Sequence, residues 1–598
     1  MDVSASVASG TGSRSMADLA HLAAEKYAGG RALTFKSDGE WQDVSYEELG
    51  RVVSEVGRGL IDLGLEQGDK VAILSHTRPE WTYANLAILS AGAVSVSIYQ
   101  TNSSDECHYV LRHSESKAVF VEDAEQLAKV RAVEDDLPQL EHVIVFDPPE
   151  DGTDPGNAVT LAELRERGAE RPESDLAARR DAVTTDDTCI VIYTSGTTGP
   201  PKGCVISHGN YRDVTDMTIA RDMLGVDDEV VYLFLPLAHA FAKLVQYVAI
   251  DLGGAIAYWE KDPQQIIPNL MEVKPTYFPS VPRIFEKIYT LATTVAEDRA
   301  ELDRAVQVGV EVRRLEAAGQ EVPAELRERF DRAEERLYAK VRGLFGGRIR
   351  QCVTGAAPIA QEILEFFYAC GVPVMEGYGM TETSTVATAN VPEEFRFGSV
   401  GRPLPRMEVK TDDAGELLLK GPNIFKGYYK DEEATREALV DAWLHTGDLG
   451  RIDDDGFVYI TGRKKDIIIT AGGKNITPAN LENGLKQNRY ISQAVVIGDR
   501  RPYLIALITV DPEEAPAFAS ANDLEADDVA GSEQMRAEVE GAVEEVNSNV
   551  GPVEQIKKFT ILPQDFTQET GELTPTQKVK RNVVNEKYAD AIEALYAK

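Results

Sequence analysis

Residues 193–203 constrain this chain more than any other stretch, because they join a buried strand to a loop rich in hydrogen-bond donors. The loop reads Tyr-Thr-Ser-Gly-Thr-Thr-Gly-Pro-Pro-Lys-Gly and follows the apolar run 189–192. Its glycines let backbone N–H groups face an anion, and Lys202 adds a positive charge. A Walker A loop is excluded, because Gly203 follows Lys202 where that motif needs Ser or Thr. The pattern predicts a polyphosphate-binding loop of another kind; an ordinary turn after a core strand needs fewer such residues.

Length and composition predict a folded protein with at least two domains. The chain has 598 residues, of which 43% are hydrophobic, so a single core is too small for it. Its formal net charge of -37 argues against binding nucleic acid or anionic lipid surfaces, because both would repel it. We interpret the acidic excess as a solvated surface. Any anionic ligand therefore needs a local basic site.

The start of the chain and its cysteines indicate a cytoplasmic protein. Residues 1–15 are rich in Ser, Ala and Gly and have no apolar segment, so they are expected to be disordered and not a signal peptide. The longest apolar stretch, 86–98, is shorter than the roughly 20 residues of a membrane span. The five cysteines show no metal-ligand spacing, which fits a reduced compartment.

Alternating strand-like and helix-like segments predict an α/β fold with doubly wound, mainly parallel sheets. Strand-like runs include 70–74, 118–121, 142–146 and 230–235, separated by amphipathic stretches. We expect this N-terminal domain to span residues 16–462. Such a domain binds its ligands at the carboxyl ends of its strands.

Residues 291–345 interrupt this pattern with apolar residues at helical spacing on either side of Gly319 and Pro323. They predict a helical hairpin inserted into the N-terminal domain. A coiled-coil partner surface is the alternative, but each apolar stripe is only about three turns long, which favours a hairpin packed on its own domain.

Two further sequence patterns follow the α/β region. Residues 406–462 have short alternating strands and tight turns at 413–415 and 454–456, which predict a small β subdomain. Beyond them, strand candidates at 494–497 and 504–510 lie between helical segments. We therefore expect a small, mobile α+β C-terminal domain over residues 463–598.

Polar motifs follow several strand-like runs. Residues 376–383, Glu-Gly-Tyr-Gly-Met-Thr-Glu-Thr, present an aromatic ring, a hydroxyl and a carboxylate after the run 372–375. Residues 354–358, Thr-Gly-Ala-Ala-Pro, end another strand. Taken alone, each segment could equally be an ordinary turn at the end of a strand. Together with the first loop, they place polar groups at strand ends, where ligands of open α/β sheets bind.

Three segments near the C-terminus complete the set of motifs. Residues 441–465 read Asp-Ala-Trp-Leu-His-Thr-Gly-Asp-Leu-Gly, then a hairpin, then Thr-Gly-Arg-Lys-Lys. Residues 471–475 form an Ala-Gly-Gly-Lys-Asn loop, and residues 573–581 form the basic stretch Leu-Thr-Pro-Thr-Gln-Lys-Val-Lys-Arg. A basic stretch is usually a solvated face, but this one stands in a strongly acidic chain.

These motifs, in this order over most of the chain, resemble the adenylate-forming superfamily, and within it the AMP-forming long-chain fatty acid-CoA ligases. The resemblance implies ATP, Mg²⁺ and CoA as cofactor and co-substrates, and a fatty acid as substrate. It implies an ATP-binding set consisting of Thr194, Ser195, Gly196, Thr197, Thr198, Gly199, Lys202, Gly355, Ala356, Ala357, Glu376, Gly377, Tyr378, Gly379, Asp448 and Arg463.

The resemblance also implies catalytic roles. Thr381 is matched to the α-phosphate, Glu382 to Mg²⁺ and Lys578 to the family's catalytic lysine, with Gln577 where many members have glycine. Lys465 falls on the family's domain hinge. His239 resembles a residue beside the carboxylate and the thiol entry, although a lone His after a strand also has a structural reading.

Further matches concern the two other substrates. Gly472 and Gly473 match the segment that meets the pantetheine arm of CoA. Gly379 and residues 281–288 resemble the corresponding positions of long-chain members of the family. Acetate-using relatives have a bulky Trp at the position of Gly379.

Three functions remain open at this stage: a fatty acid-CoA ligase, a fatty acyl-AMP ligase that passes the acyl group to a carrier protein, and a non-enzymatic acyl-nucleotide sensor. The acyl chain length, the oligomeric state and any peripheral membrane contact also stay open.

Overall fold

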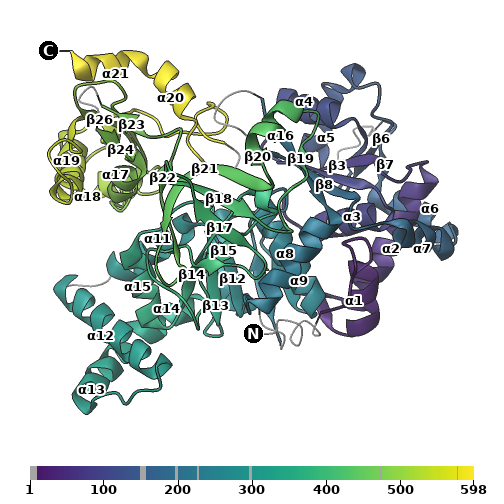
Figure 1. Ribbon diagram of the computed structural model, residues 1–598, viewed down its shortest axis with the longest axis horizontal. Helices are drawn as coiled ribbons and strands as arrows, with labels where there is room; N and C mark the ends of the chain where they lie inside the picture. Colours follow the sequence, from purple (N-terminus) through teal and green to yellow (C-terminus); the bar gives the residue numbers. More distant parts are fainter. Residues whose placement is uncertain are drawn as a thin grey trace.

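The structure is a computed structural model that describes residues 10–148, 156–194, 200–224, 228–294, 299–470, 474–574 and 577–597. Within them, the chain forms two large sheets of nine and eight strands, a five-stranded sheet, and sheets of three and two strands. Helices cover the large sheets (Figure 1). The predicted α/β class is confirmed.

The two large sheets are mainly parallel. The first has the order β16 (Arg402–Pro403), β15 (Thr388–Ala389), β14 (Val374–Tyr378), β13 (Gln351–Thr354), β12 (Tyr277–Ser280), β10 (Val230–Leu233), β11 (Ala255–Tyr258), β1 (Arg31–Ser37), β2 (Glu40–Ser45). The second has the order β19 (Gly427–Tyr428), β9 (Lys202–Ser207), β8 (Thr188–Thr194), β4 (Val94–Ile98), β3 (Lys70–Leu74), β5 (Ser116–Val121), β6 (His142–Val145), β7 (Val159–Thr160). All four strand-like runs singled out in the sequence are strands.

Several helices of this N-terminal part begin at capping residues whose side chains accept from free backbone N–H groups. Ser45 accepts from the backbone N–H of Glu48, and Ser103 forms a capping box with Glu106. The helices are α1 (Leu19–Tyr27), α2 (Tyr46–Asp62), α3 (Pro79–Ser90), α4 (Ser104–Ser114), α5 (Ala124–Arg131), α6 (Leu161–Glu170), α7 (Glu173–Ala182), α8 (His208–Ala220), α9 (Ala240–Leu252), α10 (Ile266–Val273), α11 (Pro282–Thr294), α15 (Gln361–Cys370) and α16 (Glu432–Ala438). Among the described residues, no helix is both long and apolar enough to cross a bilayer.

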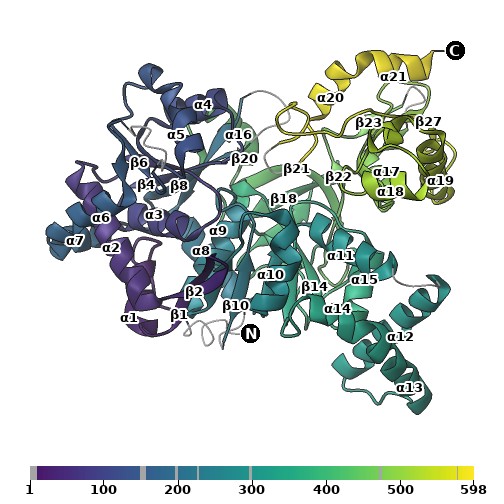
Figure 2. The same ribbon diagram turned by 180° about the vertical axis from the view of Figure 1, so that it is seen from behind.

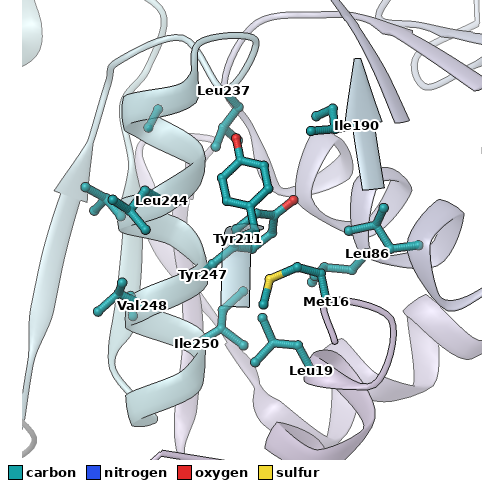
Figure 3. Close-up of a cluster of buried hydrophobic side chains, with 14 of the residues drawn as sticks. Met16, Leu19, Leu86, Ile190, Tyr211, Leu237, Leu244, Tyr247, Val248 and Ile250 are labelled. Carbon is teal, nitrogen blue, oxygen red and sulfur yellow. The ribbon is translucent and has the colours of Figure 1, made fainter. Parts of the chain in front are cut away.

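The largest apolar core joins the two sheets through α3, α8 and α9. Leu86 of α3, Ile190 of β8, Tyr211 of α8 and Tyr247 of α9 converge in it (Figure 3). Each buried aliphatic side chain of this kind contributes about 1.5–3 kcal/mol. Since α9 begins directly after His239, this core fixes the position of that residue.

The inserted segment, for which a hairpin is expected, is helical in its described residues. It comprises α12 (Arg299–Ala317), α13 (Ala324–Ala333), a π-helical segment (Glu334–Tyr338) and α14 (Ala339–Leu344). The tip of the hairpin projects from the body in both views (Figures 1 and 2). Its base is anchored, because Val312 and Tyr338 are fully buried in a second core with Phe367 of α15.

The predicted β subdomain is an antiparallel sheet with strands β17 (Glu408–Thr411), β18 (Glu416–Lys420), β20 (Leu439–Val440), β21 (Trp443–Ile452) and β22 (Val458–Arg463). Gly415 lies in the turn between β17 and β18 and Gly456 in the turn between β21 and β22, with φ angles of +82° and +85°. Such angles strain other residues, which explains why the turns could be located in the sequence.

The C-terminal part forms a separate unit with its own cores. Its elements are β23 (Ile468–Ile469), β24 (Asn475–Ile476), α17 (Pro478–Leu485), β25 (Ile491–Ile497), β26 (Leu504–Val510), α18 (Ala515–Ala521), α19 (Glu533–Ser548), β27 (Ile556–Ile561), α20 (Arg581–Lys587) and α21 (Ala589–Tyr596). Both strand candidates of the sequence lie here. The unit sits beside β21 and β22 (Figure 2).

Residues 10–15 differ from the expectation of a disordered start. The backbone N–H of Thr11 donates to Asp251 at 3.0 Å, and the N–H of Ser15 donates to Asp18 at 3.1 Å. Ser13 and Ser15 are buried. A carboxylate near the end of α9 thus captures a segment whose composition alone predicts disorder. Residues 1–9 lie outside the described part of the chain.

Candidate active site

The predicted phosphate loop connects two antiparallel strands of the second sheet. Thr194 ends β8 and pairs with Lys202, the first residue of β9. The Thr194 hydroxyl donates to the Lys202 carbonyl at 3.4 Å. The five loop residues between them that were assigned to ATP, Ser195, Gly196, Thr197, Thr198 and Gly199, lie outside the described residues.

The base-binding segments follow two neighbouring parallel strands. Thr354 ends β13 and is in register with Glu376 of β14, so Gly355 and Gly377 follow side by side. A Cβ on Gly355 would lie 3.2 Å from the Gly377 carbonyl oxygen, which shows how closely the two segments approach. Ala356 has a φ of +67°, a left-handed conformation that costs a non-glycine residue about 1–3 kcal/mol. Such strain concentrates at ligand sites.

Ala356 and its neighbour Ala357 are exposed to solvent at this edge. Small exposed side chains after a strand leave room for a flat ring.

The pKa of Glu376 is shifted in a direction that was not predicted from the sequence. Burial raises the pKa of its carboxyl to about 8. Its Oε2 atom and the Thr354 hydroxyl are buried and have no hydrogen-bond partner among the described residues. Two neighbouring unpartnered oxygens at the end of β13 and β14 fit a site that a polar ligand completes.

Tyr378, Asp448 and Arg463 form one hydrogen-bonded group. Tyr378 Oη donates to Asp448 Oδ2 at 2.8 Å, and Arg463 Nε donates to Asp448 Oδ1 at 3.1 Å. Asp448 and Arg463 are cross-strand partners of β21 and β22. The side chain of Asp448 keeps 13% of its surface exposed. Each carboxylate oxygen retains a lone pair for further donors, such as sugar hydroxyls.

Gly379 is required by a close approach of two backbone segments. A Cβ at this position would lie 2.0 Å from the carbonyl oxygen of Thr385. Thr385 has a φ of +124°, and its hydroxyl donates to the Ala240 carbonyl at 2.9 Å. The absence of a side chain at Gly379 is therefore explained by packing, independently of acyl chain length.

Thr381 and Glu382 lie in a 3-10 turn, Thr381–Thr383, which begins two residues after Gly379. Both are buried. Tyr428 Oη donates to Glu382 Oε1 at 2.7 Å, and the Lys202 ammonium lies 5.1 Å from the Tyr428 ring centroid. Tyr428 thus connects the predicted metal ligand with the lysine of the phosphate loop.

His239 is the N-cap residue of α9. Its Nδ1 accepts a hydrogen bond from the Phe241 N–H at 3.3 Å. Burial, followed by the charges of Lys578 and Lys243, lowers its pKa to about 4. His239 is therefore neutral at physiological pH, and its interaction with Lys578 shows that the C-terminal unit reaches this helix end.

Lys578 is the residue of the C-terminal unit that enters the site. The charges of Arg463, Asp448 and Glu382 all act on its ammonium. Burial, and next Arg463, lower its pKa, while Asp448 and Glu382 oppose that shift. The residue as a whole is exposed to solvent, although protein atoms crowd around its ammonium.

The segment that carries Lys578 is held on both sides. The Lys578 N–H donates to Thr574 Oγ1 at 3.0 Å, and the Thr574 N–H donates to the Lys578 carbonyl at 2.8 Å. Arg581 binds both carboxylate oxygens of Glu482. Gln577 has a φ of +60°, a left-handed conformation that glycine would adopt without strain.

Most of the predicted site is therefore together in space. The residues of the site lie where the two large sheets, the β subdomain and the C-terminal unit come together. They are Glu382, Tyr378, Asp448, Arg463, Lys202, His239 and Lys578. Gly472 and Gly473 lie outside the described residues. Neither the contact of Tyr428 with Glu382 nor that of Arg581 with Glu482 was predicted, because the partners are distant along the chain and no local spacing marks the pairs.

Comparison with known proteins defines the class of this site. Residues 21–429 match the AMP-binding enzyme family, and residues 465–598 match the AMP-binding enzyme C-terminal domain. The chain belongs to the AMP-binding enzyme family, and the resemblance found in its motifs is confirmed.

Individual relatives support the same family. The chain is 40% identical to "Long-chain-fatty-acid--CoA ligase FadD15" of Mycobacterium bovis (strain ATCC BAA-935 / AF2122/97) over 570 residues, which cover 94% of this chain and 93% of the relative. It is 34% identical to "Long-chain-fatty-acid--CoA ligase ACSBG2" of Gallus gallus, covering 96% of this chain and 80% of the relative.

Solved structures share the fold. The adenylation domain of a carboxylate reductase from Mycobacterium chelonae superposes with a TM-score of 0.78 at 22% identity, covering 100% of this chain and 93% of that domain. The anthranilate CoA ligase AuaEII in complex with anthranoyl-AMP gives a TM-score of 0.72 at 20% identity, covering 96% of this chain and 97% of that one.

Proposed function

We propose that this protein is an AMP-forming long-chain fatty acid-CoA ligase, which converts a fatty acid, ATP and CoA to acyl-CoA, AMP and diphosphate through an acyl-adenylate. The observation that carries the proposal is the meeting of Lys578 with Glu382, Asp448 and Arg463 at the end of β14 and β22. The names of the two relatives above support the choice of substrate.

ATP would lie along the strand ends. Tyr378 would stack on adenine beside Gly355, Ala356 and Ala357, and Asp448 would accept from the ribose hydroxyls. Arg463, already bound to Asp448, would hold the ribose and a phosphate. The triphosphate would meet the loop between Thr194 and Lys202, with Thr381 at the α-phosphate.

Glu382 fits a role as Mg²⁺ ligand. Mg²⁺ is commonly held by one or two carboxylates together with substrate phosphates. Tyr428 occupies one oxygen of Glu382 and fixes the direction of the other. Bound there, the ion would neutralise phosphate charge.

In the first half-reaction two anions must meet, and Lys578 would reduce the repulsion between them. An oxygen of the fatty acid carboxylate attacks the α-phosphorus, the bond to diphosphate breaks, and acyl-AMP forms. The Lys578 ammonium stabilises both negative groups as they approach. In the second half-reaction, the CoA sulfur attacks the acyl carbon, the thiol loses its proton, and AMP leaves.

Both half-reactions would use one pocket, so the C-terminal unit has to move between them. We propose a hinge at Lys465 that withdraws Lys578 and admits the thiol past His239. The segment with Gly472 and Gly473 would then meet the pantetheine arm. Water exclusion would protect the acyl-AMP meanwhile.

One assay separates the ligase from its alternatives. AMP release that depends on both a fatty acid and free CoA supports the proposal, and a C4 to C20 series gives the chain length. Accumulation of acyl-AMP in the presence of CoA would instead indicate a fatty acyl-AMP ligase that serves a carrier protein. Binding of acyl-AMP without diphosphate release would indicate a sensor.

Lys578→Ala tests the assigned mechanism. The variant should lose at least 100-fold in diphosphate release, in line with the ~10²–10³-fold cost of removing one preorganised electrostatic group. It should keep most of the thioester formation from supplied acyl-AMP. Both rates are measured in single turnovers. An equal loss in both half-reactions would refute the role of this lysine.

We also propose a cytoplasmic location, because the five cysteines are free and buried. Cell fractionation with a soluble marker tests it; recovery with the membranes would contradict it.

A further inference from the structure

Helix α11 has two faces, one packed in the core of the N-terminal part and the other in contact with the C-terminal unit. Phe285 and Ile288 are fully buried in the core of the N-terminal part, so the helix is rigidly anchored. Arg283 and Lys287 lie one turn apart on the helix, and each keeps more than a third of its side chain exposed. Residues at i and i+4 share a face of a helix. This face meets the C-terminal unit.

Two ion pairs join this face to the C-terminal unit. Arg283 binds Asp511, and Lys287 Nζ lies 2.5 Å from Glu513 Oε2. Both acids lie in the short segment between β26 and α18. Cations one turn apart on α11 therefore match acids two residues apart in this segment.

Asp511 is a fixed partner for Arg283. Its side chain is only 4% exposed, and its Oδ1 accepts from the Glu513 N–H at 2.9 Å. The Asp511 carbonyl also accepts from the Ala515 N–H at 2.9 Å, at the start of α18. The carboxylate is thus held in place by its own turn before it meets Arg283.

The ion pairs coexist with the inserted position of Lys578. Their acidic partners, Asp511 and Glu513, belong to the same unit as Lys578, whose ammonium in this arrangement is within reach of the charges of Glu382 and Asp448. We infer that Arg283 and Lys287, through Asp511 and Glu513, are positioning residues that hold the C-terminal unit in the orientation that forms the acyl-adenylate. This inference rests on the proposed function of Lys578.

Charged contacts suit a junction that must open in every catalytic cycle. Partly exposed ion pairs are modest in strength and are weakened by salt. An apolar contact of similar extent would expose its surface to water when the unit rotates. The two pairs therefore favour one orientation without locking it.

The test exchanges the charges of the more exposed pair. Lys287→Glu and Glu513→Lys are each expected to slow diphosphate release about tenfold and to leave thioester formation from supplied acyl-AMP within twofold. The double variant should recover at least half of the wild-type rate, because the pair is restored with reversed polarity. Arg332→Asp, on the exposed face of α13, is the matched control for a charge reversal and should change neither rate.

A second readout does not depend on catalysis. The Gln568 side chain donates to the Thr101 carbonyl at 3.1 Å across the same two units. In a Thr101→Cys, Gln568→Cys background, a short bismaleimide should cross-link the units quickly. Lys287→Glu should slow this reaction several-fold, and the double charge exchange should restore it. The native cysteines are buried and should not compete.

The outcomes separate the two claims. Equal loss in both half-reactions, without recovery in the double variant, would overturn the positioning role. An unchanged cross-linking rate in Lys287→Glu would overturn it as well. If the wild type instead releases no diphosphate with any fatty acid while the cross-linking rate still follows the charges, the proposed function fails and the contact between the units stands.

Discussion

At the scale of single residues, Glu376 shows how burial changes the chemistry of a site. Its carboxyl has a pKa of about 8, so the folded protein binds a proton that the unfolded chain releases above pH 4.5. Between these values, stability must fall as pH rises, because the native state binds more protons. Stabilisation by the proton is fully present below pH 4.5 and lost by pH 8.

Glu376→Gln should remove this dependence, because an amide stays neutral. We expect the variant to be more stable than the wild type at pH 8 by about 1–3 kcal/mol, an advantage that shrinks towards pH 5. Urea unfolding at several pH values measures it. A difference that is constant with pH would contradict the shifted pKa.

Gly379 leads to a second prediction at this scale. The Cβ of Gly379→Ala would lie within 2.0 Å of backbone that cannot move aside, so we expect a loss of about 2 kcal/mol or more. Gly343→Ala in α14 is the control: its Cβ meets nothing within 4 Å, and the change should be neutral or stabilising. Urea unfolding compares the two. Wild-type stability of Gly379→Ala would show that Thr385 can move.

At the scale of elements, local sequence rules located most strands and turns but not the contacts between them. The strand at 70–74 and the turns at Gly415 and Gly456 could be predicted from the sequence, because periodicity and φ preference act within a few residues. The Tyr428–Glu382 hydrogen bond was not, since it joins residues 46 positions apart. The packing of residues 10–15 against Asp251 was missed for the same reason.

The segment that carries Lys578 gives a prediction at this scale. Gln577 holds a left-handed conformation, which costs a residue with a side chain about 1–2 kcal/mol. Gln577→Gly should stabilise the C-terminal unit by about 0.5–1 kcal/mol, after allowance for the greater freedom of glycine in the unfolded chain. Gln577→Val should destabilise it, because β-branched residues tolerate this conformation poorly. Denaturant unfolding of both variants checks the sign.

At the scale of the whole molecule, the sequence predicted the order of the parts but not how they meet. The motifs of residues 376–383 and 441–465 indicated a shared nucleotide, which fixes their proximity to each other. The position of Lys578 among Glu382, Asp448 and Arg463 depends on the orientation of the C-terminal unit, and that orientation is set by contacts such as Arg283 with Asp511. No spacing in the sequence encodes such a contact.

The last prediction concerns the independence of the C-terminal unit. Within the described residues, its two apolar cores draw only on positions between Ile468 and Tyr596, while the contacts to the rest of the chain named above are ion pairs and a hydrogen bond. A unit with its own core and a polar boundary should fold alone. A fragment of residues 465–598 should therefore give dispersed amide resonances and one cooperative thermal transition. A fragment that stays unfolded would show that α11 and the β subdomain supply stability that its own cores lack.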